Sequence, residues 1–228
     1  ALRRDPADSR VNTAMARLCL KRGMFEEAEQ RLNLALSRLT KNYTSPKDGE
    51  AYYYLGVALK AQGKKGAAYD AFYKATWSQA WAGAAYYSLA EIVCEKGDFS
   101  IALDFLDRSL SMNSLNTKAL NLKSAVLRKL GRFEDAREMA SRVLGFDPLD
   151  FWAGNELYLA NSSLGKKEEA LEEKQGLKIK MRDSAQSYLE LASDYGNCGL
   201  LDEASEILLR LIDSRKKWDS TYPMLYYY

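Results

Sequence analysis

The sequence predicts an all-α fold, a right-handed superhelical solenoid built from helix–turn–helix repeats. Three regularities in its 228 residues predict it: glycines recur at gaps of 40, 34, 34, 34 and 34 residues, an alanine lies five residues after each, and in four repeats a small residue lies seven residues before. A fixed period of this length is typical of repeat architectures, in which each unit packs on its neighbours. The glycines are Gly23, Gly63, Gly97, Gly131, Gly165 and Gly199.

Helix packing gives each of these positions a physical role. Two antiparallel helices approach to about 8–10 Å, which small residues at the crossing permit. Glycine supplies the backbone angles that the turn between them requires. The alanines are Ala28, Ala68, Ala102, Ala136, Ala170 and Ala204, and the small residues before the glycines are Ala16, Gly56, Ala90 and Ala192. Ser124 and Tyr158 stand at this position in the other two repeats, so we expect local adjustments of packing there.

Three segments carry a resemblance to a known family. They are the run 52–56 with Gly63 and Ala68, the run 86–90 with Gly97 and Ala102, and the runs 131–136 and 146–148. The pattern resembles the tetratricopeptide repeat family over essentially the whole chain, although Lys123 stands where leucine is usual. The resemblance implies a solenoid whose first helices line a concave groove.

The repeat phase also predicts the organisation of the chain as one solenoid. A partial repeat at 1–8 and another at 219–228 interrupt the period at the two ends, so we expect a fragment of a longer protein. The six full repeats are predicted at 9–48, 49–82, 83–116, 117–150, 151–184 and 185–218.

Composition narrows the function classes. The chain has 33 basic and 31 acidic residues, a balance that does not favour nucleic acid as a partner. It has no histidine, no phosphate-binding or nucleophile-elbow motif and no metal-type cysteine spacing. We therefore expect no enzyme, no catalytic residue, no cofactor, no metal and, without an apolar stretch of about 18 residues, no membrane span. The three cysteines lie in different repeats, so we expect no disulfide; they suit a cytoplasmic protein and do not exclude export.

The expected function is therefore binding of a protein or peptide segment in the concave groove. Helical spacing places positions 2, 5, 9, 12 and 13 of each repeat on that face. Aromatic residues and arginine dominate interface energies, asparagine can bond an extended backbone, and the charges of the groove alternate in sign. The candidate partner-binding residues are Arg17, Tyr53, Tyr87, Glu91, Asn121, Arg128, Lys129, Trp152 and Asn155. Charge reversal at Arg128 and Lys129 is expected to weaken partner capture without unfolding the chain.

An alternative follows from a narrower resemblance. The runs 74–81, 84–87 and 147–153 look like the repeat region of large bacterial proteins that carry a separate β-rich domain similar to carbohydrate-active folds. The resemblance implies a helical accessory arm whose chemistry lies outside this chain, with a domain of the same protein as partner. Trp77, Trp81, Tyr86 and Tyr87 would then form a sugar-stacking or docking face, or simply cover the core. A purely structural spacer is the third hypothesis.

Overall fold

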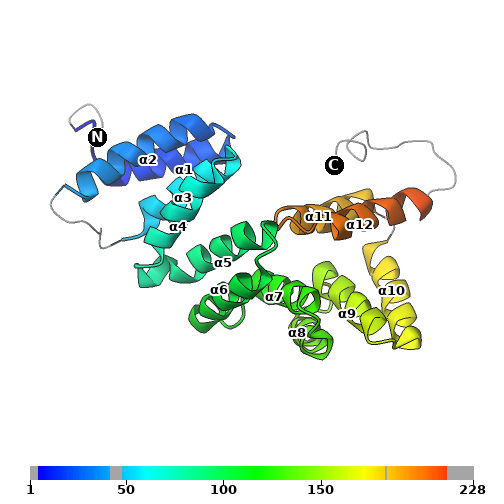
Figure 1. Ribbon diagram of the computed structural model, residues 1–228. Helices are drawn as coiled ribbons and strands as arrows, with labels where there is room; N and C mark the ends of the chain where they lie inside the picture. The colour runs from blue at the N-terminus through cyan, green and yellow to red at the C-terminus, as the bar shows by residue number, and fades with distance from the viewer. Residues whose placement is uncertain (1–4, 42–47, 183, 215–228) are drawn as a thin grey trace. The chain divides into compact units, whose positions relative to one another are not determined.

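The computed structural model describes residues 5–41, 48–182 and 184–214, and all regular structure in these ranges is helical (Figure 1). The predicted all-α class is confirmed. The partial repeat predicted at 219–228 and most of the one at 1–8 lie outside the described residues. Within the described ranges, no helix is long and apolar enough to cross a membrane.

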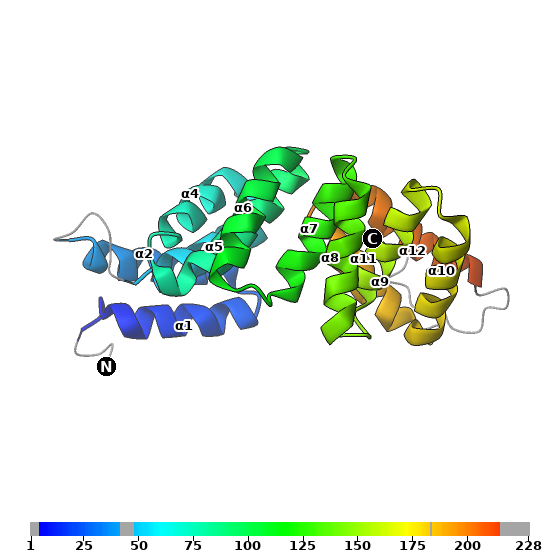
Figure 2. The same ribbon diagram turned by 90° about the horizontal axis from the view of Figure 1, so that it is seen from below.

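Twelve helices in these ranges follow one another as six consecutive pairs, or hairpins (Figure 2), and in five of them the two helices pack on each other. In the remaining pair, the Ser109 hydroxyl of α6 donates to the Gly83 carbonyl of α5 at 2.7 Å. The first three hairpins comprise α1 (Ser9–Lys21), α2 (Phe25–Leu39), α3 (Glu50–Ala61), α4 (Lys65–Ala75), α5 (Gln79–Glu95) and α6 (Phe99–Met112). The last three comprise α7 (Thr117–Lys129), α8 (Phe133–Phe146), α9 (Phe151–Ser163), α10 (Lys167–Met181), α11 (Ala185–Gly196) and α12 (Leu201–Ser214).

The chain divides into two compact units. Unit 1 comprises Ala1–Ile92 and Asp107–Ser114, and unit 2 comprises Val93–Leu106 and Leu115–Tyr228. In unit 1, α1 packs on α2 and α3, and α3 on α4. In unit 2, the first helix α9 contacts both α7 and α11. Each of these three helices also packs on the second helix of its own hairpin.

The six periodic glycines end the first helix of every hairpin, as the sequence predicts. Each has a left-handed backbone, with φ between 71° and 82°. In each turn the N–H after the glycine donates to the carbonyl five residues earlier, for example from Met24 to Cys19 and from Arg132 to Leu127, both at 2.9 Å. This pattern is the Schellman motif, which satisfies the last carbonyls of a helix.

Small residues fill the crossings between paired helices. Ala16, Ala28 and Ala136 have no exposed surface, and a Cβ on Gly56 would lie 2.6 Å from the Phe72 ring. Ser124 is also fully buried, and its hydroxyl donates to the Ala136 carbonyl at 2.7 Å. The serine is therefore accommodated at the crossing by a hydrogen bond across the hairpin.

Tyr158, the other departure, is half-buried on α9. The Lys174 ammonium lies 5.5 Å from its ring centroid and the Arg210 guanidinium 4.8 Å. Tyr158 occupies the small-residue position of its repeat, and cation–π contacts with these two groups stabilise its ring there.

One helix begins earlier than its repeat boundary suggests. α5 starts at Gln79, whereas the predicted repeat begins at residue 83. The additional turn places Trp81 on the helix, where its ring meets residues of α3.

Candidate partner-binding surfaces

The first helices of the hairpins supply all nine candidate residues. We call the surface that they form in each unit the first-helix face: α1, α3 and α5 up to Ile92 in unit 1, and α7, α9 and α11 in unit 2.

In unit 1, half-buried aromatic side chains gather on this face. We call Tyr53, Tyr54 and Trp81 the aromatic cluster. The Trp81 ring centroid lies 5.0 Å from that of Tyr53 and 5.4 Å from that of Tyr54, and the Arg17 guanidinium lies 5.3 Å from the Tyr54 ring. Aromatic pairs in such tilted and edge arrangements contribute about 0.5–1.5 kcal/mol each beyond the area they bury. The cluster is thus a rigid patch with partly accessible rings.

Ion pairs between successive first helices flank the aromatic cluster. Arg17 of α1, half exposed, pairs with Glu50 of α3 at 3.4 Å. Lys60 of α3 pairs with Glu91 of α5 at 2.8 Å, and the Glu91 side chain is only 13% exposed. Glu91 therefore joins two first helices, whereas Arg17 keeps accessible surface beside the rings. Tyr87, also on α5, is half-buried.

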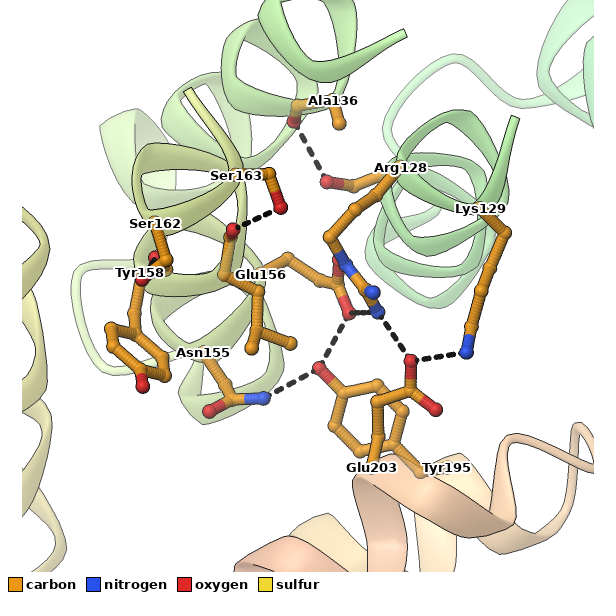
Figure 3. A network of polar contacts seen from close by, with 12 residues as sticks. Arg128, Lys129, Ala136, Asn155, Glu156, Tyr158, Ser162, Ser163, Tyr195 and Glu203 are labelled. Carbon is orange, nitrogen blue, oxygen red and sulfur yellow. Dashed lines mark hydrogen bonds and ion pairs between the residues drawn. The ribbon is translucent and has the colours of Figure 1, made fainter. Parts of the chain in front are cut away.

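In unit 2, charged groups meet inside the fold. We call Arg128, Lys129, Asn155, Glu156, Tyr195 and Glu203 the polar network (Figure 3). Arg128 donates from Nε to Glu156 Oε2 at 2.9 Å and from Nη2 to Glu203 Oε1 at 2.8 Å. Lys129 pairs with the same Glu203 oxygen at 2.7 Å.

Two neutral side chains complete the network. The Tyr195 hydroxyl donates to Glu156 Oε1 at 2.6 Å and accepts from Asn155 Nδ2 at 2.8 Å. Four helices, α7, α9, α11 and α12, therefore meet through one set of hydrogen bonds.

Burial makes these interactions strong. The Glu156 side chain has no exposed surface and that of Glu203 has 6%. Burial opposes the charge of Arg128, but the attraction of Glu156 and the bond to Glu203 outweigh it and raise the pKa of Arg128. Burial opposes ionisation of Glu203 too, yet bonds from Lys129 and Arg128 lower the pKa of that carboxyl. For Tyr195, burial and then Glu156 raise the pKa.

Asn121 and Trp152 lie beside this network and are both 3% exposed. Asn121 Nδ2 donates to both carboxylate oxygens of Asp150, at 3.0 and 2.9 Å. Asp150 also caps α9 by accepting from the Ala153 N–H at 2.8 Å. The Trp152 ring packs on Tyr195 with centroids 5.3 Å apart. The amide and the indole thus hold helices together.

A pocket opens on the first-helix face of unit 2, with a cavity volume of about 200 Å³. We call it the acidic pocket because three carboxylates and one ammonium group line it. Its charged lining residues are Lys118, Asp150, Glu190 and Asp194. Asn121, Trp152 and Phe151 form part of its wall.

Comparison with known proteins identifies the repeats. A family model of the tetratricopeptide repeat matches residues 13–85 and 87–151, more than half of the chain. The chain belongs to the tetratricopeptide repeat family.

Solved structures of tetratricopeptide repeat proteins share this fold. MamA has a TM-score of 0.65 at 19% identity, over 78% of this chain and 94% of that one. YrrB, described as a TPR protein with an unusual peptide-binding site, has a TM-score of 0.65 at 21% identity, over 82% and 93%. A tetratricopeptide repeat protein of Parabacteroides merdae has a TM-score of 0.70 at 17% identity, over 90% and 79%. At these identities the likeness establishes the fold alone.

The tetratricopeptide fold places the nine candidates in two different environments. Arg17, Tyr53 and Tyr87 keep accessible surface. Asn121, Trp152 and Asn155, which the sequence places in the groove, are buried, because each packs on or bonds to a residue of another helix. A helical wheel separates groove from core but does not show that a long side chain lies against the next repeat.

The contacts of Arg128 add an expected effect of charge reversal on the fold itself. That side chain is 11% exposed and compensates two buried carboxylates, so a negative charge there would place three carboxylates together. Lys129 is 26% exposed and shares one of the two carboxylates.

Sequence reasoning missed three members of the polar network: Glu156, Tyr195 and Glu203. A signal for Glu156 was present. It lies on α9 among Ala153, Leu157 and Ala160, all of them buried. An acid on an apolar helical face needs a cationic partner, which directs attention to the arginine one repeat earlier. Nothing comparable marks Glu203, which lies on a helix with acidic residues in its first turn.

The described ranges contain no group of three or more Cys, Asp or Glu side chains that could hold a metal ion. The three cysteines are buried, and none of them is in a disulfide.

Proposed function

We propose that this chain is a non-catalytic scaffold that binds a segment of a partner protein on its first-helix face, in the concave groove of the repeat family. The observation that carries the proposal is the aromatic cluster of unit 1, with Arg17 beside it. Tyrosine, tryptophan and arginine are the residue types that dominate binding energies at interfaces. The peptide-binding site ascribed to YrrB supports such a role for this fold.

The proposal assigns partner contact mainly to Arg17, Tyr53 and Tyr87, with Tyr54 and Trp81 added from the structure. Rings already fixed by neighbouring rings lose little conformational freedom on binding, which lowers the entropic cost of association. Glu91 and the five candidates in unit 2 would act by fixing the helices on which the face is built.

Selection from a random peptide library tests the proposal. Peptides enriched on the wild-type protein are expected to bind Tyr54→Ala at least about tenfold more weakly, since truncating an interface hot spot costs about 2 kcal/mol or more. Tyr73→Ala is the matched control, because Tyr73 is an exposed tyrosine on the second helix α4. Circular dichroism checks that both variants fold. An absence of enrichment, or equal binding by Tyr54→Ala, would contradict the proposal.

A second candidate function is a helical accessory arm of a larger carbohydrate-related protein. Exposure of Trp77, at 58%, favours it, since an exposed indole can stack on a sugar or dock on a neighbouring domain. Trp152, buried, does not contribute to such a platform. A glycan array with the wild-type protein and Trp77→Ala decides between the two functions. Glycan binding that depends on Trp77 supports the arm, and its absence leaves the peptide scaffold.

A further inference from the structure

The acidic pocket carries more negative charge than its own lysine compensates. Glu190 and Asp194 are four residues apart on α11 and therefore share one face of that helix, where like charges repel. Lys118, the lining cation, is 66% exposed and reaches Asp194 only at 4.0 Å. An ion pair this exposed and this long contributes little.

Burial adds to the imbalance. Asp194 lies in a partly buried position, which raises its pKa, and although Lys118 opposes the shift, Asp150 and Glu190 add to it. Asp150 takes its hydrogen bonds from the Asn121 amide and the Ala153 N–H, neither of which carries a compensating positive charge. A cation entering the pocket would relieve three carboxylates together.

Two side chains that line the pocket carry unsatisfied polar atoms, an observation independent of the carboxylates. Within the described part of the chain, Asn121 Oδ1 and Trp152 Nε1 have no hydrogen-bond partner, although both side chains are 97% buried. An unsatisfied buried polar group costs free energy, about 1–3 kcal/mol. One atom is an acceptor and the other a donor, a combination that matches the N–H and C=O of a peptide.

We propose that the acidic pocket binds the guanidinium group of an arginine in a partner protein segment, between Glu190 and Asp194. In the described ranges, these carboxylates are not grouped as metal ligands, which favours an organic cation over a metal ion. Guanidinium is planar, can bond two carboxylates at once and stacks on aromatic rings such as that of Phe151 in the wall. The inference rests on the proposed scaffold function only in taking the arginine from a partner segment.

A tripeptide probe tests the pocket without any partner. N-acetyl-glycyl-arginyl-glycine amide is titrated into the ¹⁵N-labelled protein, and the Trp152 indole resonance, assigned with Trp152→Phe, reports binding. A saturable shift is expected with arginine, a weaker one with lysine, and binding at least about tenfold weaker with citrulline, which has nearly the same shape and no charge. An equal response to arginine and citrulline, or no response, would overturn the proposal.

Two substitutions give effects of opposite sign. Asp194→Asn is expected to weaken arginine binding about tenfold, whereas Lys118→Met should strengthen it a few-fold, because Lys118 competes for Asp194. Weaker or unchanged arginine binding by Lys118→Met would overturn the assignment. If Lys118 only supported the fold, its removal would not increase the affinity for arginine. Glu172→Gln, an exposed acid on α10, is the matched control and should bind as wild type. Tyr54→Ala should also leave tripeptide binding unchanged, so failure here and failure of the aromatic cluster are distinguishable.

Discussion

Replacing Arg128 by methionine isolates what the polar network contributes to stability. Methionine keeps much of the apolar length of arginine and removes the charge and all three hydrogen bonds, two to Glu156 and one to Glu203. Of its partners among the described residues, Glu156 then keeps the Tyr195 hydroxyl, and Glu203 keeps Lys129. The variant therefore leaves one carboxylate without any cation in a fully buried position.

The expected cost follows from burial. Removing one partner of a buried ion pair destabilises a protein by about 3–5 kcal/mol, because the remaining charge is stranded away from water. Glu203 retains a cation, which places the expected loss of unfolding free energy near the lower end, at about 3 kcal/mol. Arg132→Met is the matched control. Arg132 pairs with Asp135 at 2.7 Å, but both side chains are about half exposed, so the loss should stay below about 1 kcal/mol.

Hydrogen exchange is the appropriate assay, since it resolves the loss of stability repeat by repeat. Amides of α9 and α11 should lose protection in Arg128→Met, whereas those of α1 and α2 should not change, because repeats are coupled mainly to their neighbours. The carboxyl titration gives a second check. Stabilisation from the lowered pKa of Glu203 is present above its ordinary value of 4.5 and is lost as the pH falls through the folded pKa, so the difference between variant and wild type should narrow in acid.

A double mutant decides whether the cost arises from stranded charge. Glu156→Gln removes the buried charge and keeps a group that can accept from Tyr195. Combined with Arg128→Met, it should recover about 1.5 kcal/mol relative to the sum of the single losses. The reasoning is refuted if Arg128→Met costs no more than Arg132→Met, or if the two network substitutions are simply additive.

Two further predictions concern the turns and the alkaline limit. Gly131 and Gly199 have nearly the same φ, 76° and 74°, but a Cβ on Gly131 would meet nothing within 4 Å, whereas one on Gly199 would lie 2.5 Å from the Glu95 Cα. Gly131→Ala should therefore cost about 1 kcal/mol and Gly199→Ala at least twice that in urea titrations, and equal losses would contradict the close contact. Because its pKa is raised in the folded protein, Tyr195 stays protonated while the unfolded chain ionises, so stability should fall as the pH rises above 10; Tyr195→Phe, measured by thermal unfolding against pH, should lose that part of the slope.

Local rules were sufficient to predict the hairpins. Glycine at a fixed period, a small residue seven positions before it and an alanine five positions after it depend only on the geometry of two crossing helices. The structure bears this out at Gly23, Ala16 and Ala28 in the first hairpin, and the hydrogen bond of Ser124 shows how a polar residue is tolerated at the same position. What the period could not predict was the early start of α5, because Trp81 is held there by rings of α3 rather than by the repeat.

The candidate site was predicted less well because its chemistry depends on contacts between repeats. Asn121 and Asn155 occupy the same position of their repeats, yet the first donates to Asp150, the N-cap of α9, and the second donates to a tyrosine 40 residues away. A position within one repeat does not determine whether such an amide lies in the groove or against a neighbour.

The same contacts explain how the two surfaces differ. In unit 1, the first helices contact one another through aromatic rings as well as ion pairs, and Arg17, Tyr54 and Trp81 keep accessible surface. In unit 2, Arg128 donates its hydrogen bonds to buried Glu156 and Glu203. The acidic pocket has Lys118, an exposed side chain, as its lining cation. The two proposed modes of recognition, apolar contact in the first unit and charge in the second, therefore use the side chains that the contacts within each unit leave accessible.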